Sequence, residues 1–384
     1  MQAVILAAGE GRRVRPLTRS RPKAMIPVAN RPIIEYVIEA LVKNGIRDII
    51  VVVGYRKEQV TRYLNQMDIP VDVVVQNKQL GSGHALLSAE SKIHDNFLVL
   101  PGDNYIDPSS IARIKDIPNA MLVKEHQNPS NFGVVMLHEG HVTHIVEKPA
   151  HATSFMVSTG IYSLTKEIFG HIRENNLTDA ISSLIKSGVK IQGIPADDWQ
   201  DAIFAWDLLK MNRRLLPTIS PSRDGSASRQ TIIQGAVRIG KGTTIGPNTV
   251  ITGPVVIGND CDIGPNCCIL PNTSIGSRVK IEPFTIIGES IIMDDTVIGS
   301  HSRIIDTVTG ERCILADHTS TWTTSGILDI EGLAVRSEFG AILGDSIICG
   351  PFSILKNSMI GNSVTIEGRA SLSSRYIPDN STVI

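Results

Sequence analysis

The first part of the chain alternates between two hydrophobic periods. Short apolar runs rich in β-branched residues predict buried strands. These runs cover residues 3–6, 49–53, 71–75 and 97–100. Between them, apolar residues recur at helical spacing from Pro32 to a stop at Gly45, and again near 57–65 and 83–93. Alternating strands and helices predict βαβ units, so we expect an α/β domain that is doubly wound around a mainly parallel sheet.

A different pattern starts near residue 232, where the hydrophobic period becomes six. Isoleucine occupies every sixth position from Ile233 to Ile287. From Ile239 onward, a small or β-branched residue precedes each isoleucine by two positions, so both should point into one core. Two inward positions in six residues describe one flat side of a parallel β-helix, in which three sides make a coil. Glycine follows many of these isoleucines, as at Gly240 and Gly258, and is expected at the bends.

The six-residue register then breaks and returns. It lapses after Ile287, resumes at Ile298 and Ile304, and blurs through residues 310–335, where we expect an inserted loop. It is expected to resume at Ile342, Ile348, Ile354, Ile360, Ile366 and Leu372.

Between the two patterns lies a stretch rich in Ser, Pro and Gly that is typical of a linker. The expected organisation is therefore a first domain at 1–217, a linker at 218–231 and a β-helix domain at 232–384.

The composition and charge of the chain limit the kinds of partner that it can bind. The chain has 37 Lys and Arg against 38 Asp and Glu, a net charge of -1, without the positive bias of a nucleic-acid surface. No apolar run approaches the ~20 residues that span a bilayer. We therefore expect no nucleic-acid or membrane partner, and a cytoplasmic protein. The five cysteines show no CxxC spacing, so neither a zinc site nor a disulfide framework is expected.

A glycine-rich basic loop follows the first strand, at the position where open α/β sheets bind ligands. Gly9 and Gly11 allow the backbone to approach phosphates closely. Positive charge comes from Arg12, Arg13, Arg15 and Lys23. Val14 replaces the third glycine of a dinucleotide-binding fingerprint, so the loop predicts a phosphate site of another kind.

This loop resembles the signature of sugar-1-phosphate nucleotidylyltransferases, in which Gly-x-Gly-x-Arg is followed by Pro-x-Thr and Pro-Lys. The segment from Leu6 to Pro27 has these residues in this order. The resemblance implies a Rossmann-like nucleotidyltransferase domain in which Arg13 and Lys23 are catalytic and contact the triphosphate and the transferring phosphoryl group. It also implies that the nucleotide lies against Leu6, Ala8, Gly9 and Gly11.

Further segments match the same family. Gln76 lies in a segment that resembles the pyrimidine site of the uridylyltransferase branch, so it would bond uracil while Gly81 packs nearby. A helix start capped by Ser82 is the alternative reading. Asp103 ends a buried strand, the usual place for a magnesium ligand beside nucleotide phosphates. The segment Trp199-Gln-Asp201 resembles the element that carries the second metal ligand, with Asp207 as the alternative.

The sugar-phosphate elements of the family also occur in order. The matching residues are Gly133, Glu147, Lys148, Ser158 and Thr159. Ser158 stands where the uridylyltransferase branch typically has Asn, which leaves the sugar preference open.

The implied reaction is Mg2+-dependent transfer of a nucleotidyl group from UTP or dTTP to a hexose-1-phosphate, giving a nucleotide sugar and pyrophosphate. N-acetylglucosamine-1-phosphate is the first candidate acceptor, and glucose-1-phosphate is the alternative. The acceptor phosphate is already an anionic nucleophile, so no general base is needed. The thymine methyl is worth about 0.8 kcal/mol on burial, so a relaxed choice of base is physically easy.

The hexapeptide repeat resembles the left-handed β-helix of acyltransferases, whose members are commonly trimers. The two-part layout resembles bifunctional enzymes that make UDP-N-acetylglucosamine and whose β-helix acetylates glucosamine-1-phosphate. That resemblance implies acetyl-CoA as a further substrate and His301 as the candidate acetyltransferase base. The residue three positions on is Ile304, where the acyltransferase pattern has Tyr.

Two alternatives leave out the second reaction. The β-helix would then serve only to assemble a homotrimer, or the whole chain would be a non-catalytic regulatory scaffold. The presence of Arg13, Lys23 and Asp103 together argues against a scaffold.

Overall fold

Strand β1 (Gln2–Ala7) lies inside a nine-stranded sheet with the order β5-β4-β1-β6-β11-β8-β12-β10-β9. The structure is a computed structural model that describes residues 1–173 and 175–384, and the described chain divides into two units. The first unit comprises Met1–Glu10, Arg21–Met25 and Pro32–Asp201. The second unit comprises Gly11–Ser20, Ile26–Arg31 and Ala202–Ile384. The nine-stranded sheet belongs to the first unit.

Four neighbouring strands of this sheet are parallel. They are β5 (Asp72–Val75), β4 (Asp48–Val53), β1 and β6 (Phe97–Pro101). The chain runs from β1 outward to β4 and β5 and returns to β6 on the other side of β1. The boundary between β1 and β6 is therefore the topological switch point, beside which open α/β sheets bind their ligands.

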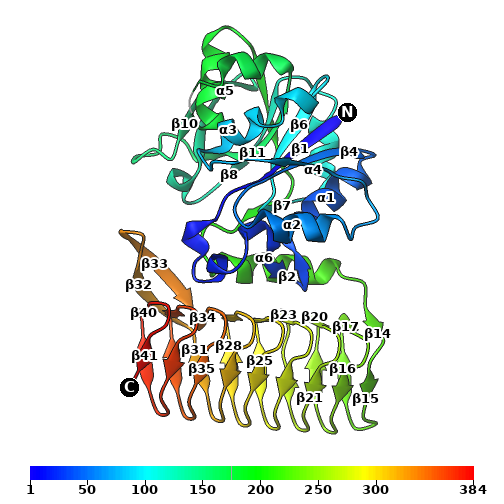
Figure 1. Ribbon diagram of the computed structural model, residues 1–384, viewed down its shortest axis with the longest axis vertical. Helices are drawn as coiled ribbons and strands as arrows, with labels where there is room; N and C mark the ends of the chain where they lie inside the picture. Colours follow the sequence, from blue (N-terminus) through cyan, green and yellow to red (C-terminus); the bar gives the residue numbers. More distant parts are fainter. Residues whose placement is uncertain (174) are drawn as a thin grey trace. The chain divides into compact units, whose positions relative to one another are not determined.

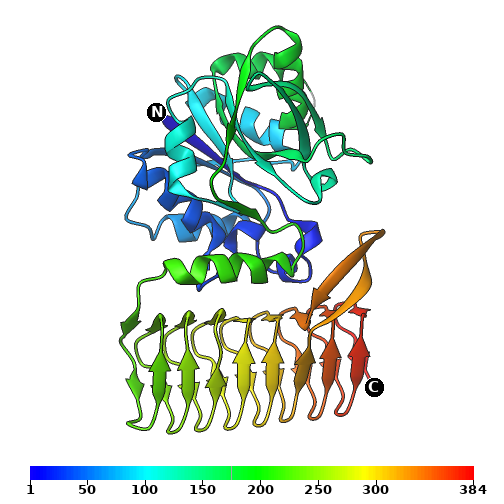
Figure 2. The ribbon, with the colours of Figure 1, turned by 180° about the vertical axis from the view of Figure 1, so that it is seen from behind.

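Helices connect these strands where the sequence predicts them, although the third ends at Leu87 and a separate 3-10 turn, Glu90–Lys92, follows it. They are α1 (Ile33–Lys43), α2 (Lys57–Leu64) and α3 (Ser82–Leu87). Helix α3 and helix α5 (Leu177–Lys186) share a core with Val4, Ile50 and Val99 on one face of the sheet. Right-handed crossovers place α1 and α2 on the opposite face, so the sheet is covered on both sides (Figures 1 and 2).

The other half of the sheet is largely antiparallel, so the expectation of a mainly parallel sheet is wrong for this half. Its strands are β11 (Met156–Leu164), β8 (Ala120–Glu125), β12 (Ile191–Pro195), β10 (His141–Glu147) and β9 (Gly133–His138). Strands β9 and β10 are joined at Glu139 and Gly140, whose φ angles are 48° and 77°. A two-residue turn with both φ angles positive connects only antiparallel strands, which fixes the pairing.

Three stacks of parallel strands form most of the second unit (Figure 1). Two stacks have nine strands, from β14 (Ser222–Arg223) to β40 (Tyr376–Ile377) and from β15 (Ser226–Ala227) to β41 (Thr382–Val383). The third has eight, from β16 (Ile232–Gln234) to β39 (Ser371–Ser373). Successive strands of the chain pass from stack to stack, which is the parallel β-helix that the repeat predicts, consistent with the left-handed form.

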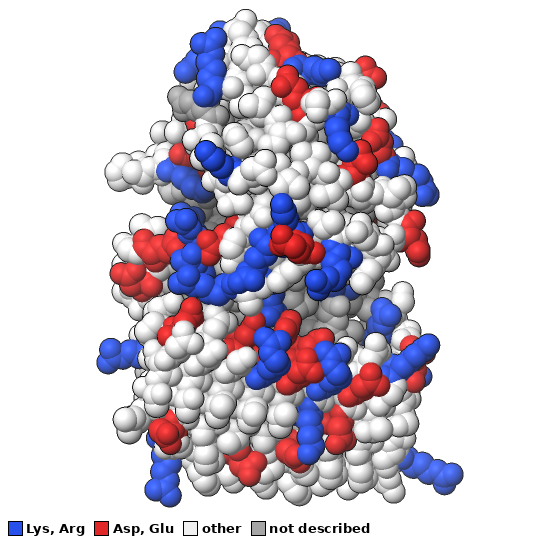
Figure 3. Space-filling view, in the orientation of Figure 1, with Lys and Arg blue, Asp and Glu red and all other residues white. Residues whose placement is uncertain are grey.

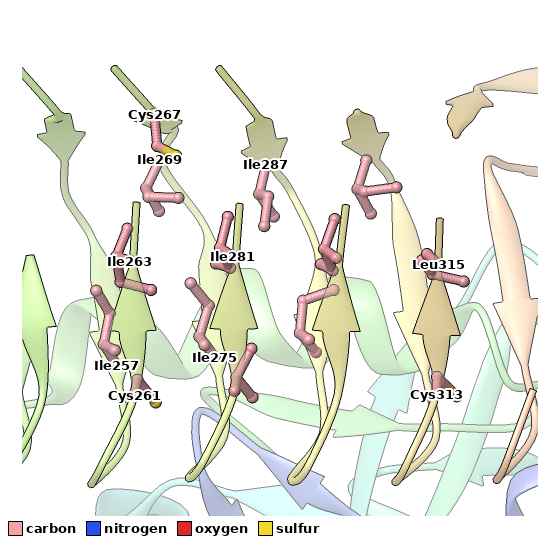
Figure 4. Packing of buried hydrophobic residues seen from close by; sticks show 14 of the residues in the cluster. Ile257, Cys261, Ile263, Cys267, Ile269, Ile275, Ile281, Ile287, Cys313 and Leu315 are labelled. Carbon is pink, nitrogen blue, oxygen red and sulfur yellow. The ribbon is translucent and has the colours of Figure 1, made fainter. Parts of the chain in front are cut away.

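The inward positions of the repeat are confirmed through Ile287. Side chains such as Ile263, Ile275 and Cys267 are at most 1% exposed and pack in one cluster inside the coils (Figure 4). Ile233, at the start of the repeat, is only partly buried against this cluster. The interior is thus built from stacked β-branched residues that suit a pleated surface.

The coil shortens by one residue partway along the β-helix. Ile257 pairs with Ile275 in the next coil, eighteen positions on, whereas Ile275 pairs with Ile292, seventeen positions on. The later coils keep the shorter repeat, as in the pairing of Leu343 with Ile360, except for one coil with inserted residues, in which Thr309 pairs with Leu343, thirty-four positions on.

The shorter coil overturns part of the expected register. Leu343, Cys349 and Leu355 face the interior, while Ile348 is 51% exposed and Ile354 is only half-buried. A one-residue shift moves a strand side chain to the other face, so counting sixes through the interrupted stretch selected the wrong residues. Ile360 and Ile366 return to the interior, as expected.

Glycines after the inward isoleucines do not make the bends. A Cβ on Gly258 would lie 2.5 Å from the carbonyl oxygen of Gly276 in the next coil, so glycine is needed for close stacking. The bends instead use residues with positive φ, such as Asn248, Asp260 and Asn266. Asn and Asp adopt this conformation more readily than other non-glycine residues.

The expected inserted loop is an antiparallel hairpin, and it lies later than predicted. It consists of β32 (Thr324–Ile330) and β33 (Leu333–Phe339), and it separates β31 (Ser320–Trp322) from β34 (Ala341–Leu343). Coils continue up to residue 322, because β30 (Ile314–Leu315) pairs on both sides with its stack.

Strands β14 and β15 fall within residues 218–231, where the sequence predicts a linker. They pair with β17 (Val237–Ile239) and β18 (Thr244–Ile245), so this stretch contributes strands to the stacks. The division at 217 and 232 stays a prediction about which parts fold on their own. Among the described residues, no helix is long and apolar enough to cross a membrane.

Candidate active site

Lys23 lies between two carboxylates in the first unit. Its Nζ is 2.9 Å from Asp103 Oδ2 and 2.8 Å from Asp201 Oδ1. Asp103 follows β6 after one residue, Gly102, at the carboxyl end of a parallel strand. Asp201 ends β13 (Trp199–Asp201), which pairs with β7 (Asn104–Ile106) so that Asp201 lies opposite Asn104. This pairing brings two acids together that are far apart in the sequence.

The charge of Lys23 is stabilised by these neighbours. Its side chain is 9% exposed, and burial alone would lower its pKa. The attraction of Asp103 and Asp201 outweighs that effect, so the pKa of Lys23 lies above its ordinary value. The lysine is therefore a fixed positive charge at neutral pH.

The donor set suits a magnesium ion that is bound together with phosphates. Among residues 1–173 and 175–384, no group of three or more His, Cys, Asp or Glu could hold a metal by itself. Mg2+ commonly uses only one or two carboxylates plus substrate phosphates. Asp103 and Asp201 already converge on one cation, the Lys23 ammonium, so their arrangement fits such a site.

Asp207, the alternative second ligand, is engaged elsewhere in its own unit. It begins α6 (Asp207–Leu215), where its Oδ2 accepts the Phe204 N–H at 2.9 Å and its Oδ1 lies 3.1 Å from Lys210 Nζ. These contacts are those of a residue that stabilises a helix start. The structure thus brings Asp201 into the pair that Lys23 joins, while Asp207 has a helix-start role within the second unit.

The glycine-rich loop divides between the two units. Leu6 and Ala8 lie at the end of β1 in the first unit, and Gly9 is exposed after them. Gly11 has a φ of 76° and starts the 3-10 turn η1 (Arg12–Val14), which carries Arg13 in the second unit.

Basic side chains gather on this part of the surface. The segment 11–20 contains Arg12, Arg13, Arg15 and Arg19. Figure 3 shows a cluster of Lys and Arg on the face where this segment lies. Such a cluster suits an anionic ligand.

Gln76 and Gly81 come together at the start of α3. Gln76 is 3% exposed, its Nε2 donates to the Gly81 carbonyl at 3.1 Å, and it lies 2.9 Å from His84 Nδ1. Gly81 has a φ of 137°, and a Cβ there would collide with the Asn175 carbonyl. His84, which sequence reasoning missed, thus orients the amide that the family resemblance assigns to the base.

The predicted sugar-phosphate residues form a connected group. Gly133 lies opposite Glu147 in the β9–β10 hairpin. Glu147 Oε2 accepts the Thr178 hydroxyl at 2.8 Å, and its Oε1 lies 3.0 Å from Lys148 Nζ. Both carboxylate oxygens of Glu147 therefore have a partner.

Ser158 and Thr159 are buried in β11. The Ser158 hydroxyl lies 2.9 Å from the Tyr162 hydroxyl, and Thr159 Oγ1 donates to the Leu122 carbonyl at 3.0 Å. Burial raises the pKa of Tyr162 to about 12, with the hydrogen bond to Ser158 opposing the shift and the charge of Glu147 adding to it. Tyr162 and Thr178 were not selected from the sequence, because each is a single polar residue in an otherwise ordinary strand or helix.

His301 belongs to a stack of rings along one corner of the β-helix. Its ring lies 4.9 Å from that of Phe284 and 5.1 Å from that of His318, and Phe352 continues the row 4.5 Å beyond His318. We call these four residues the aromatic ladder. Each has a φ between 55° and 62°, one residue per coil, so the repeat itself aligns them. Both faces of the His301 ring are covered.

Comparison with known proteins shows which family the chain is similar to. Residues 2–216 match the model described as nucleotidyl transferase, and residues 251–383 match that of the GMPPB C-terminal domain. A protein called bifunctional protein GlmU from Methanococcus maripaludis is 39% identical, with 96% of this chain and 95% of that protein covered. The protein of the same name from Methanocaldococcus jannaschii is 35% identical, with 100% and 97% covered.

Other matches extend over less of the chain. A glucose-1-phosphate thymidylyltransferase from Streptomyces antibioticus is 30% identical over 83% of this chain and 98% of that protein. Among solved structures, UDP-glucose pyrophosphorylase from Acinetobacter baumanii aligns with a TM-score of 0.51 at 25% identity, covering 56% of this chain and 92% of that one.

The fold and the site define an enzyme that transfers nucleotidyl groups, built on an α/β domain with a β-helix behind it in the sequence. The chain belongs to the nucleotidyl transferase family. Within that family it is a sugar-1-phosphate nucleotidyltransferase, which confirms the class that the glycine-rich loop predicts.

Proposed function

We propose that this enzyme transfers a uridylyl group from UTP to N-acetylglucosamine-1-phosphate and releases UDP-N-acetylglucosamine and pyrophosphate. The observation that carries the chemistry is the convergence of Asp103 and Asp201 on Lys23. The name GlmU of relatives that align over nearly the whole chain supports the choice of substrates. The pair dTTP and glucose-1-phosphate is the alternative, supported by the thymidylyltransferase relative.

In this mechanism an oxygen of the acceptor phosphate attacks the α-phosphorus of the nucleotide. The bond from the α-phosphorus to the bridging oxygen of the β-phosphate breaks, and pyrophosphate leaves with that electron pair. Lys23 and Arg13 neutralise negative charge on the phosphates. Asp103 and Asp201 would hold Mg2+, which supplies further charge neutralisation when bound.

The remaining residues orient the two substrates. Gln76, fixed by Gly81 and His84, would recognise the pyrimidine. Glu147 and Lys148 would bind sugar hydroxyls and the sugar phosphate, with Gly133, Ser158 and Thr159 shaping the same pocket. Holding both substrates in line is the main contribution that a protein makes to this reaction.

The test is pyrophosphate release by the purified full-length chain with Mg2+. UTP, dTTP, CTP, ATP and GTP are each paired with the 1-phosphates of glucose, glucosamine and N-acetylglucosamine. Turnover that is highest with UTP and N-acetylglucosamine-1-phosphate supports the proposal, and preference for another pair replaces the substrates. Asp103→Asn should remove turnover, while the exposed control Asp95→Asn should keep it. No turnover with any pair would favour a regulatory scaffold.

A second activity is favoured by the word bifunctional in the names of the archaeal relatives. We propose that the β-helix also transfers the acetyl group of acetyl-CoA to glucosamine-1-phosphate, with His301 as the base that accepts the amine proton. The assay is the release of free CoA thiol when glucosamine-1-phosphate is added. Loss of release in His301→Ala, with retention in His171→Ala of the first unit, supports this role. If the unmodified protein releases no CoA thiol, the β-helix has no acetyltransferase activity and its proposed role is assembly alone.

We further propose that the enzyme is a cytoplasmic homotrimer assembled through the β-helix. Val297, Ile314 and Ile348 stack in register on one outer face, and the latter two are 48% and 51% exposed. A row of exposed apolar residues is typical of an interface. Ile314→Lys should dissociate the trimer in sedimentation velocity, while Asp262→Lys in the same outer row should not. A monomeric unmodified protein would refute the assembly.

A further inference from the structure

We propose that the β-helix positions the nucleotide-binding segment 11–20, so that Glu331, Asn362 and Asp379 are positioning residues for nucleotidyl transfer. This inference rests on the proposed function, because Arg13 in this segment is assigned to the triphosphate. The described chain groups Gly11–Ser20 with the β-helix, although the segment is flanked in the sequence by residues of the other unit.

Side chains of the β-helix contact the segment at both arginines that follow Arg13 and at the backbone between them. Arg15 Nη1 lies 3.4 Å from Glu331 Oε1, and Arg19 Nε lies 3.4 Å from Asp379 Oδ2. Asn362 Nδ2 donates to the Pro16 carbonyl at 3.3 Å. All of these contacts therefore lie just C-terminal to Arg13. They involve two arginine side chains and the backbone between them.

The segment has little regular structure of its own. It consists of η1 (Arg12–Val14) and η2 (Leu17–Arg19), single turns of 3-10 helix. Its internal side-chain hydrogen bonds are short-range, such as those from Thr18 Oγ1 to the Gly11 carbonyl at 3.0 Å and from Ser20 Oγ to the Leu17 carbonyl at 3.4 Å. Such short turns are poorly stable alone, so external contacts have a large influence on their order.

The β-helix side of these contacts is supported by contacts of its own. Glu331 forms the tip of the β32–β33 hairpin with a φ of 53°, and the neighbouring Gly332 N–H donates to Asp329 Oδ1 at 2.8 Å. At the base of the hairpin, the buried Phe339 ring stacks 5.3 Å from the Trp206 ring. The turn and the base of the hairpin thus each have stabilising contacts.

Asn362 and Asp379 are coupled through the coil repeat. They lie seventeen positions apart in adjacent coils, and the Asn362 N–H donates to Asp379 Oδ1 at 2.8 Å. The Asn362 side chain also lies 3.3 Å from the same oxygen. The last coils therefore present a fixed amide and a fixed carboxylate to the segment.

Each contact is partly exposed and weak alone, so the contacts should act together. The arrangement gives the inserted hairpin a role in the first reaction, in addition to any role of the β-helix in assembly. Weakening these contacts should disorder the segment, and binding of the triphosphate should become weaker. The acceptor sugar phosphate should bind unchanged.

The experiment compares full-length Glu331→Gln, Asn362→Ala and the double variant with the unmodified chain. Glu338→Gln is the matched control, because Glu338 is an exposed acid on the same hairpin, in β33 and away from the tip. Hydrogen exchange is followed in peptides that cover residues 11–20, and steady-state kinetics give KM for each substrate. We expect faster exchange in these peptides for the double variant, and a KM for the nucleotide raised about three- to tenfold with little change for the sugar phosphate.

Unchanged exchange in residues 11–20 would overturn the proposal whatever the kinetics show. Faster exchange with an unchanged nucleotide KM would overturn the positioning role. Partial recovery of both readouts in Glu331→Asp relative to Glu331→Gln would support a role for the charge. If the unmodified chain has no turnover, the proposed function fails, while the exchange measurement still decides whether the β-helix orders the segment.

Discussion

Replacing Lys23 by Met separates its electrostatic role from its packing. Methionine is unbranched and of similar length, so the pocket stays filled. The change leaves Asp103 and Asp201 facing each other without the cation that lies 2.9 Å and 2.8 Å from them. We expect lower stability, loss of nucleotidyl transfer and a stronger response to Mg2+.

The size of the stability loss follows from exposure. Removing one partner of a fully buried ion pair costs about 3–5 kcal/mol, while exposed pairs contribute about 0–1 kcal/mol. Lys23 is 9% exposed, but the two carboxylates are 35% and 24% exposed and regain some hydration. We therefore expect a loss of about 2 kcal/mol. For a unit of this size that corresponds to a fall in Tm of about 4–8 °C.

The assay is scanning calorimetry of the full-length chain with and without millimolar Mg2+. Lys92→Met is the matched control, because Lys92 pairs with Asp72 at 2.8 Å on the surface, with 42% and 65% exposure. Mg2+ should raise the Tm of Lys23→Met more than that of the unmodified chain, because the ion can replace the lost charge. Equal Tm losses in the two lysine variants, or equal Mg2+ responses, would refute the reasoning.

The pH dependence gives an independent check. The pKa of Lys23 is raised in the folded state, so its stabilising contribution is complete below the ordinary lysine pKa of about 10.4 and is lost as the pH rises further. The stability gap between the unmodified chain and Lys23→Met should stay constant from neutral pH to about pH 10 and narrow above it. A gap that widens in alkali would contradict this assignment.

Three further predictions test other parts of the structure. Asp201→Asn should abolish Mg2+-dependent turnover and keep the fold, whereas Asp207→Asn should cost about 1 kcal/mol at the start of α6 and keep turnover; the reverse pattern would exchange their roles. In urea unfolding, Leu355→Ala should cost about 2–5 kcal/mol and Ile354→Ala clearly less, and equal costs would contradict the shifted register. The pKa of Tyr162 is raised to about 12 in the folded state, so its contribution to folding stability is lost as the pH rises above the ordinary tyrosine value of about 10. Measurements of Tm against pH should therefore show a smaller loss of stability above that pH for Tyr162→Phe than for the unmodified chain.

Local patterns predicted much of the fold. The isoleucine repeat identified the β-helix because every coil repeats one packing requirement, and α1 was found because its apolar face and stop signal lie within one segment. The mixed half of the sheet was missed, since strand partners far apart in sequence decide its direction. The position of the hairpin was misjudged because a shorter coil and an insertion both disturb a count of sixes.

The candidate site shows the same division. Contiguous motifs selected Lys23, Asp103 and Gln76 as candidate residues, and the structure brings Lys23 together with Asp103. Tyr162 and His84 were missed because their importance arises from partners that the sequence alone does not pair. The choice between Asp201 and Asp207 likewise depends on the pairing of β13 with β7, which no local pattern encodes.

The two coil lengths constrain how this β-helix can change during evolution. A duplicated eighteen-residue coil would add cleanly among the early coils, where Ile257 pairs with Ile275. Placed among the later coils, where Ile275 pairs with Ile292, the same piece would carry one residue too many and displace the rings of the aromatic ladder. The β-helix therefore consists of two blocks with different coil lengths, and a coil of one block does not fit into the other. Coils should be gained or lost only by duplication or deletion within one block.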